Sequence, residues 1–211
     1  MKNMDNNRGH FITFEGIDGS GKSTQISLLK KRMEQGEQRC FLTAEPSTGP
    51  IGVMIRQCLS GRMKTDEKTI AALFASDRLD HLLNDTDGIC SKINQGIHVI
   101  CDRYILSSYA YQSVRVPFDW VRNLNSAAAD TLRPDCHIFI DISPETAIER
   151  MKKERFHTEL FETKDRLTEV RNRYIELIEQ LKDEETIIRI DGSQTVEQIS
   201  EEIWKNVSNI L

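Results

Sequence analysis

Short runs of apolar residues recur along the chain and alternate with longer segments in which apolar residues lie three or four positions apart. The short runs predict five β-strands, at residues 10–15, 39–43, 97–101, 136–140 and 187–190. The longer segments predict amphipathic helices, and in the first of them Ile26, Leu29 and Met33 share one face. Strands that alternate with helices are typical of an α/β fold with a mostly parallel sheet.

The boundaries of the helices are marked by caps and glycines. Helices are expected over 23–36, 51–61, 70–81 and 119–131, from Ser143-Pro144 onward, through Leu167 and Tyr174, and from the Thr195/Gln198 capping box to the end. No repeat or linker interrupts the pattern, so residues 1–211 are expected to form one domain. Residues 1–9 are polar, which predicts a flexible tail and not a signal peptide.

Composition narrows the function classes. The net charge of −5 argues against nucleic acid as the main ligand, because no basic excess is present to neutralise a phosphate backbone. No apolar run approaches the length that crosses a membrane. The five cysteines show no metal-like spacing and predict reduced thiols in a cytoplasmic protein: Cys40, Cys58, Cys90, Cys101 and Cys136.

A phosphate-binding motif follows the first predicted strand. Residues Gly16 to Ser23 fit the P-loop pattern of two glycines five apart followed by Lys and Ser, between a strand and a helix. Backbone N–H groups and the helix N-terminus would cradle phosphates, Lys22 would reach the β- and γ-phosphates, and Ser23 would hold Mg²⁺. The alternative is a glycine-rich turn before an ordinary helix. The residues assigned to ATP are Gly16, Ile17, Asp18, Gly19, Ser20, Gly21, Lys22, Ser23 and Thr24.

Polar residues also follow the other predicted strands, at the sheet edge where open α/β folds bind ligands. They are Glu15, Glu45-Pro46, Asp102-Arg103 and Asp141. Asp102 and Arg103 could organise Mg²⁺ and clamp a second phosphate. The alternative for this pair is an internal ion pair that caps the strand.

Two further patterns allow a functional and an ordinary interpretation. Phe74 and Arg78 lie one helical turn apart and could stack on a base and bond to it, whereas most such pairs are a core Phe beside a solvated Arg. The basic segment from Arg150 to His157 could close over ATP and supply an arginine, or it could be a solvated helix face.

Taken together, these segments resemble the thymidylate kinase (dTMP kinase) family of P-loop nucleoside monophosphate kinases. The resemblance runs from about Phe11 to the final helix, and its most family-specific block is Asp102 to Gln112. The other matching pieces are Phe14 to Thr24, Glu45-Pro46, Phe74 with Arg78, Leu124-Asn125 and Arg133-Pro134-Asp135. The resemblance implies a three-layer fold with a five-stranded parallel sheet flanked by helices and a small helical lid at about 149–166.

The resemblance also implies a reaction and a set of roles. ATP and dTMP would give ADP and dTDP with Mg²⁺, in a homodimer. Asp18 would hold the sugar 3′-hydroxyl, and Tyr111 would lie under C2′. Catalysis is assigned to Lys22, Asp102, Arg103 and Arg155, with Ser23 and Asp102 at the metal. Phe74 would stack on thymine, Arg78 would bond to its O4, and Ser108 and Gln112 would lie around the base. Arg56 and Arg103 would bind the phosphate. The full set of substrate-binding residues is Asp18, Glu45, Pro46, Arg56, Phe74, Arg78, Arg103, Ser107, Ser108, Tyr111 and Gln112.

Some members of the family carry an arginine inside the P-loop, where this chain has the neutral Gly19 and Ser20. The resemblance then implies that basic lid residues meet the charge on the transferred phosphoryl group, and Arg155 is favoured over Arg150 and Lys153. The chain departs from the family pattern at Ala44, at Leu160 and at Ser113-Val114-Arg115.

Three other functions fit parts of the sequence. Another nucleoside monophosphate or deoxynucleoside P-loop kinase would share most of these motifs. A GTPase-like switch would need an N-K-x-D stretch, which the sequence lacks. A catalytically inactive relative is disfavoured by the intact Lys22, Ser23, Asp102 and Arg103.

Overall fold

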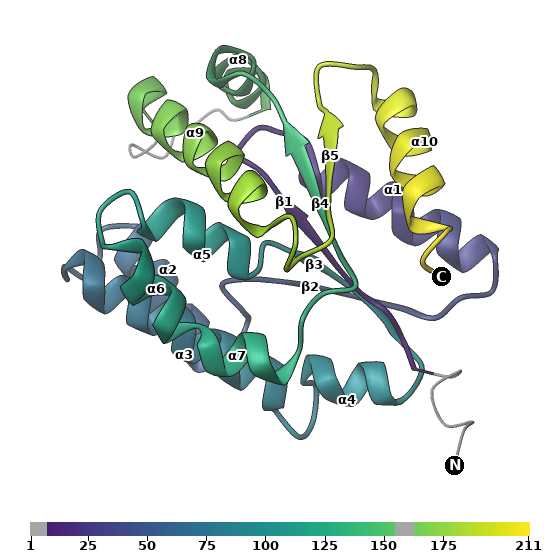
Figure 1. Ribbon diagram of the computed structural model, residues 1–211, viewed down its shortest axis with the longest axis horizontal. Helices are drawn as coiled ribbons and strands as arrows, with labels where there is room; N and C mark the ends of the chain where they lie inside the picture. The colour runs from purple at the N-terminus through teal and green to yellow at the C-terminus, as the bar shows by residue number, and fades with distance from the viewer. Residues whose placement is uncertain (1–7, 155–162) are drawn as a thin grey trace.

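A parallel sheet of five strands forms the centre of the protein. The computed structural model describes residues 8–154 and 163–211. The strand order is β2-β3-β1-β4-β5, and all four strand pairs are parallel (Figure 1). The strands are β1 (Phe11–Glu15), β2 (Cys40–Ala44), β3 (His98–Asp102), β4 (Cys136–Asp141) and β5 (Ile187–Asp191). The predicted five-stranded α/β fold is therefore confirmed.

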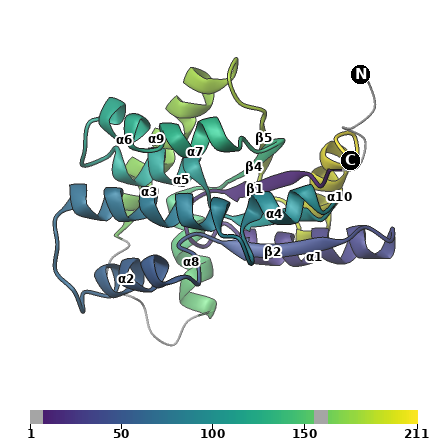
Figure 2. The same cartoon turned by 90° about the horizontal axis from the view of Figure 1, so that it is seen from below.

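Helices cover both faces of this sheet (Figures 1 and 2). On one face, α1 (Lys22–Gln35) and α10 (Val196–Val207) enclose an apolar cluster. On the other face a larger cluster includes residues of helices α3 to α9, and α2 packs against α3. These helices are α2 (Pro50–Leu59), α3 (Glu67–Leu83), α4 (Ile89–Asn94), α5 (Ile105–Gln112), α6 (Phe118–Leu124), α7 (Ser126–Thr131), α8 (Pro144–Glu154) and α9 (Lys164–Leu181).

The alternation of side chains along β1 divides its residues between the two clusters. Ile12 and Phe14 lie in the cluster beneath α1 and α10, whereas Phe11 lies in the opposite cluster. Because successive strand residues point to opposite faces, Glu15 is directed to the same side as Phe11. A carboxylate is thus brought to the buried side of the sheet that α5 and α9 cover.

The prediction of a single helix over 119–131 is wrong, because the segment forms two helices, α6 and α7, that meet at Asn125. The Asn125 side chain donates to the carbonyl of Val121 (2.8 Å) and accepts from Arg78. These hydrogen bonds hold Asn125 at the break between the two helices. The apolar periodicity of the segment gives no sign of them, so the sequence did not predict the break. The short α4 was not predicted either, since its two buried isoleucines are too few to define a period.

Among the residues that the structure describes, no helix has the length and apolar character needed to cross a bilayer.

Candidate functional site

The loop between β1 and α1 depends on glycine. Gly16, Gly19 and Gly21 have φ of 138°, 77° and 92°, values that other residues rarely adopt. A Cβ on Gly16 would lie 2.6 Å from the carbonyl oxygen of Ile140, and one on Gly19 would lie 2.6 Å from that of Ala147. Gly16 and Gly19 are therefore required both by the backbone conformation and by close neighbours, and Gly21 by its backbone conformation.

The first turn of α1 is left open to an anion. Gly21 caps the helix without a side chain, and the first turn contains no acidic residue. The free N–H groups and the positive end of the helix dipole both favour a bound phosphate. Ser23 and Thr24 are exposed in this turn, where their hydroxyls can reach a ligand. The strand, loop and helix arrangement of a P-loop is thus present.

Lys22 holds its ammonium group inside the loop. Its Nζ lies 3.2 Å from the carbonyl oxygens of Gly16 and Ile17, and the residue is 6% exposed. Burial, together with the positive charge of Arg103, lowers the pKa of Lys22 below its usual value, although three nearby carboxylates oppose the shift. Phosphate oxygens would favour the charged form and offset this cost.

Arg103 lies opposite the P-loop and reaches it. The residue follows β3 in the left-handed region (φ 69°), and its Nη2 lies 2.7 Å from Asp18 Oδ1 and 3.1 Å from the Tyr111 hydroxyl. Burial opposes the charge of the guanidinium, but Tyr111 and Asp18 hold the pKa of Arg103 well above its usual range. The ion pair of Arg103 is thus formed with the P-loop residue Asp18.

Asp102 keeps an oxygen available. Its Oδ1 is buried and has no hydrogen-bond partner among the described residues. No cluster of three His, Cys, Asp or Glu side chains that could cage a metal occurs in residues 8–154 and 163–211. Mg²⁺ bound to a nucleotide needs only one or two protein oxygens, because phosphates and water supply the others. The unpaired Asp102 oxygen and the exposed Ser23 hydroxyl fit that requirement.

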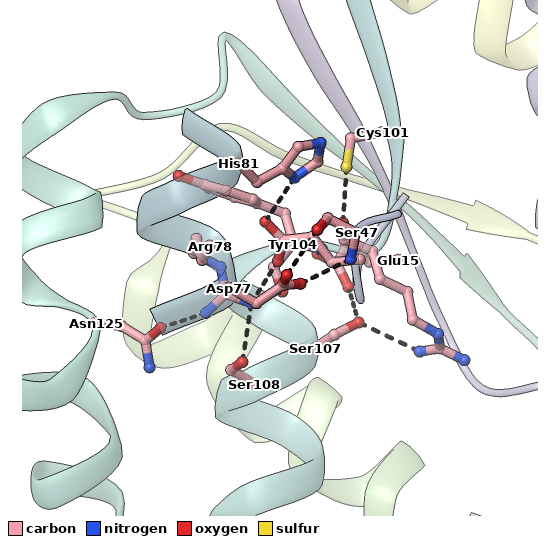
Figure 3. Close-up of polar contacts among 12 residues, drawn as sticks. Glu15, Ser47, Asp77, Arg78, His81, Cys101, Tyr104, Ser107, Ser108 and Asn125 are labelled. Carbon is pink, nitrogen blue, oxygen red and sulfur yellow. Dashed lines mark hydrogen bonds and ion pairs between the residues drawn. The ribbon is translucent and has the colours of Figure 1, made fainter. Parts of the chain in front are cut away.

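Arg78 projects from α3 into a buried polar cluster (Figure 3). The residue is 1% exposed, and its Nη2 contacts Glu45 Oε2 at 2.6 Å and Ser108 Oγ at 2.9 Å. Its Nη1 donates to Asn125. Burial lowers the pKa of Arg78, but the charge and hydrogen bond of Glu45, together with Tyr104 and Glu15, outweigh it, so the pKa is raised overall. The ordinary interpretation of a solvated Arg78 is therefore wrong.

The other base-site candidates lie around this cluster. Phe74 is half-buried one turn earlier on α3. Gln112 is buried at the end of α5, and its Oε1 has no partner among the described residues. A buried acceptor without a partner is unfavourable unless a ligand or water donates to it. The cluster thus has polar capacity that the protein itself does not use.

The loop that carries Glu45 and Pro46 is held by a residue that the sequence analysis missed. Asp77 is buried and accepts hydrogen bonds from the Ser47 backbone N–H (2.7 Å) and hydroxyl (2.6 Å) (Figure 3). The peptide between Glu45 and Pro46 is cis. The sequence signal was polar residues on the buried side of α3, where Asp77, Arg78 and His81 follow one another within a turn.

His81 is a second residue of α3 whose polar role the sequence analysis missed. Its Nδ1 lies 3.3 Å from Glu45 Oε1, and its Nε2 lies 2.6 Å from Thr43 Oγ1. Glu45 is therefore bounded by Arg78 on one oxygen and His81 on the other.

The remaining predicted residues are distributed around these groups. Arg56 is exposed and donates to the carbonyl of Pro46 (3.0 Å). Ser107 donates to the buried carboxylate of Glu15 (2.6 Å). Arg150, from α8, donates to the carbonyl oxygens of Ser20 (3.4 Å) and Gly192 (2.9 Å). The predicted catalytic Arg155 lies outside the described residues, as do residues 155–162 of the expected lid.

Parallel pairing brings the main groups to one edge of the sheet. Phe14 at the end of β1 pairs with Asp102 of β3, and Ala44 at the end of β2 pairs with the same residue. Glu15, Glu45 and Arg103 each follow within one residue of these positions. A P-loop with an arginine facing it from the neighbouring strand end defines the class of P-loop proteins that act on phosphorylated ligands.

Comparison with known proteins identifies the family within this class. A sequence model described as thymidylate kinase matches residues 14–203. A probable thymidylate kinase from Methanocaldococcus jannaschii is 41% identical over 202 residues, covering 95% of this chain and 96% of the relative. The thymidylate kinase of Caldicellulosiruptor saccharolyticus is 35% identical over 211 residues, covering 97% and 98%. That of Symbiobacterium thermophilum is 33% identical over 205 residues, covering 95% and 94%.

The chain belongs to the thymidylate kinase family. The family prediction made from the motifs is confirmed, and a different P-loop kinase is not favoured.

Proposed function

We propose that this protein transfers the γ-phosphoryl group of ATP to dTMP, giving ADP and dTDP. The observation that carries the proposal is the contact between Arg103 and Asp18, because it places a guanidinium of the β3 end against the P-loop. Two anion sites that adjoin each other are what a phosphoryl transfer between two nucleotides requires.

The donor side is the P-loop. Backbone N–H groups from Gly16 to Thr24 would bind the phosphates of ATP at the open end of α1. Lys22 would leave its two carbonyl contacts for the β- and γ-phosphates, which restore the favourable surroundings that its buried charge lacks. The protein thereby neutralises charge that develops on the transferred group.

Mg²⁺ would be held by the Ser23 hydroxyl and the Asp102 carboxylate, and when bound it neutralises phosphate charge. Asp102 contributes a fixed negative charge at the strand end, and Arg103 next to it contributes the positive charge that the acceptor needs.

The acceptor phosphate would be bound by Arg103 and Arg56. A guanidinium can hold two phosphate oxygens at once, so these residues orient the attacking oxygen as well as neutralise it. Arg56 donates to the Pro46 carbonyl, which supports a place for the Glu45-Pro46 loop beside the acceptor. Asp18 would bind the 3′-hydroxyl of the sugar, and Tyr111 would lie under C2′.

The thymine base would stack on Phe74 and reach the buried cluster of α3. Arg78 would donate to O4, with Ser108 and Gln112 around the base. Gln112 Oε1 and Arg78 Nε have no hydrogen-bond partner in the part of the chain that the structure describes, so they would offer a base an acceptor and a donor. Ser107, which lies on α5 with Gln112, would support the base site through its hydrogen bond to the buried Glu15.

The arginine that stabilises the transition state is proposed to be Arg155, which follows α8. Arg150 at the end of the preceding segment contacts the P-loop at Ser20, which supports a donor role for a basic side chain of this region. An arginine supplied to a transferring phosphoryl group contributes roughly 10³–10⁵ in rate in related chemistry.

We also propose a cytoplasmic homodimer. The five cysteines are unpaired thiols, as in a reducing compartment. The exposed apolar side chains of α2 are Val53, Met54 and Leu59, which suit a subunit contact. Sedimentation equilibrium on the chain and on Met54→Glu tests this assembly, and a wild-type monomer would contradict it.

The activity is tested with an acceptor panel. ADP formation is measured with ATP and Mg²⁺ in the presence of dTMP, dUMP, UMP, CMP or thymidine. We expect turnover to depend on dTMP and to be highest with it. Hydrolysis of ATP that is independent of any acceptor would contradict the proposal.

A further inference from the structure

A buried cluster of three oxygen-bearing side chains lies directly behind Arg103. Glu15 is completely buried at the end of β1, and its Oε2 accepts hydrogen bonds from the Ser107 hydroxyl (2.6 Å) and the Tyr174 hydroxyl (3.0 Å). The Ser107 and Tyr174 hydroxyls are 2.8 Å apart. Glu15 comes from the sheet, Ser107 from α5 and Tyr174 from α9, so the cluster joins three elements.

The protons in this cluster can be assigned. Ser107 has one proton, which it donates to Glu15, and its oxygen can then accept two bonds. Arg103 Nη1 supplies one of them at 3.2 Å. The single proton of the Tyr174 hydroxyl is donated to Glu15 Oε2, and its oxygen lies 2.8 Å from Ser107 Oγ. Burial, together with the charge of Glu15, raises the pKa of Tyr174 well above its usual value, so its hydroxyl remains a donor. Ser107 thus transmits the position of Tyr174 and Glu15 to Arg103.

The backbone of Arg103 is held by the same carboxylate. Glu15 Oε1 accepts the backbone N–H of Tyr104 at 2.9 Å (Figure 3). On its other side, the Arg103 N–H donates to the carbonyl of Phe14 at 2.9 Å. Arg103 has a left-handed φ of 69°, a conformation that persists only where the surroundings enforce it. Glu15 therefore fixes both the backbone after Arg103 and, through Ser107, the side chain.

Tyr174 is itself rigidly seated. Its ring lies 5.0 Å from that of Phe139 and makes an edge contact with Tyr111 at 6.3 Å, centroid to centroid. Tyr111 in turn bonds to Arg103 through its hydroxyl and lies under the guanidinium at 4.8 Å. The tyrosine of α9 therefore reaches Arg103 by a hydroxyl route and by a ring route.

We infer that Tyr174 and Glu15 are positioning residues that hold Arg103 in the orientation that receives the acceptor phosphate. The inference rests on the proposed function, since it takes Arg103 to bind the phosphate of dTMP. A buried carboxylate and two buried hydroxyls must be bonded to one another or to a partner. Here their bonds converge on Arg103, which pairs with Asp18 of the P-loop. Apolar side chains of the same volume would leave Arg103 without this support.

The principal variant is Tyr174→Phe, which keeps the ring and removes the hydroxyl. Tyr109→Phe is the matched control, because Tyr109 is buried on α5 with its ring against Phe118. Steady-state kinetics with ATP and dTMP are measured for both. We expect the KM for dTMP to rise about 5- to 10-fold in Tyr174→Phe, in line with the loss of one hydrogen bond, with the KM for ATP unchanged within about twofold. Tyr109→Phe should match the wild type.

A double-mutant cycle shows whether the effect passes through Arg103. In an Arg103→Lys background, Tyr174→Phe should have little further effect on kcat/KM for dTMP, because residues that act as a unit are not additive. Effects that multiply, or an equal rise in both KM values, would show a general structural role and overturn the inference. Ser107→Ala removes the shared hydroxyl without touching either ring and should reproduce the selective rise for dTMP. A normal KM for dTMP in that variant would also overturn it.

Turnover by the wild-type protein distinguishes failure of the proposed function from failure of this inference alone. Absence of any dTMP-dependent turnover in the wild type would overturn the proposed function and this inference together. Normal wild-type turnover with Tyr174→Phe indistinguishable from Tyr109→Phe would overturn the inference alone.

Discussion

At the scale of single residues, the site concentrates charges whose surroundings are incomplete without a ligand. Lys22 is buried against two carbonyl oxygens, and its pKa is lowered by that burial. Asp102 has a buried oxygen without a partner among the described residues. Burial of each charged group without full compensation is unfavourable in free energy, and a bound Mg²⁺-nucleotide would supply the missing interactions.

Lys22→Ala should remove most turnover, because no other described side chain projects an ammonium into the P-loop. We expect kcat to fall below about one tenth of the wild-type value, a loss of more than ~1.4 kcal/mol of transition-state stabilisation. The measurement is steady-state ADP formation with saturating dTMP. A variant that keeps more than a tenth of kcat would contradict the role of Lys22.

Phe74→Ala should act mainly on the acceptor. Stacking of a base on an aromatic ring contributes roughly 1–3 kcal/mol, so the KM for dTMP should rise by about 5-fold or more. The KM for ATP should stay near its wild-type value. An unchanged KM for dTMP would place the base elsewhere.

At the scale of elements, α3 serves both the core and the site. Its buried polar residues hold the loop after β2, since Asp77 binds Ser47, and Arg78 and His81 bind Glu45. Ser47 also accepts the N–H of Gly49, which precedes α2. The orientation of the Glu45-Pro46 loop is therefore set by a helix thirty residues later in the chain.

Asp77→Asn should loosen that loop. The amide retains one acceptor where the carboxylate accepts two bonds, so one buried donor of Ser47 loses its partner at about 1–3 kcal/mol. We expect a lower free energy of unfolding in urea and a higher KM for dTMP, with the KM for ATP little changed. Asp80→Asn makes the same change of charge on the same helix and is the control. Equal effects of the two substitutions would indicate helix electrostatics and not the Ser47 contact.

At the scale of the whole molecule, the two ends of the parallel strands serve different purposes. The carboxyl edge carries the site, whereas the amino edge is tied together by polar contacts. Asp135, before β4, accepts from the Phe11 N–H at 2.7 Å and pairs with Arg8. His10 stacks on His98 with centroids 5.4 Å apart, and the His10 backbone N–H donates to His98 Nδ1 at 3.1 Å.

This amino-edge cluster predicts a pH dependence of stability. Burial, with a smaller effect of His10, lowers the pKa of His98, while Asp135 opposes the shift. The unfolded chain then binds this proton more readily, so its contribution to stability is full above about pH 6.5 and is lost as the pH falls through the lowered pKa. Urea unfolding at pH 7.5 and 5.5 measures the difference. His98→Asn retains an acceptor for the His10 N–H without titrating, and it should reduce the pH dependence. An unchanged pH dependence would contradict the assignment.

The sequence by itself determined the features that are written in contiguous residues. The order of strands and helices, the glycines of the P-loop and the polar residues at the strand ends are local patterns, and they were sufficient for the fold class and the family. Local spacing works here because a strand's alternation and a glycine's positive φ depend on neighbours in the chain.

Only the tertiary structure decided how the polar groups are paired. It showed that Arg103 pairs with Asp18, that Arg78 is buried against Glu45 and Asn125, and that Tyr174 reaches Glu15 from 159 residues away. These partners meet because parallel strands bring distant segments to one edge, and a buried polar group takes whichever partner lies within reach there. Such choices depend on three-dimensional proximity, which spacing along a chain does not encode.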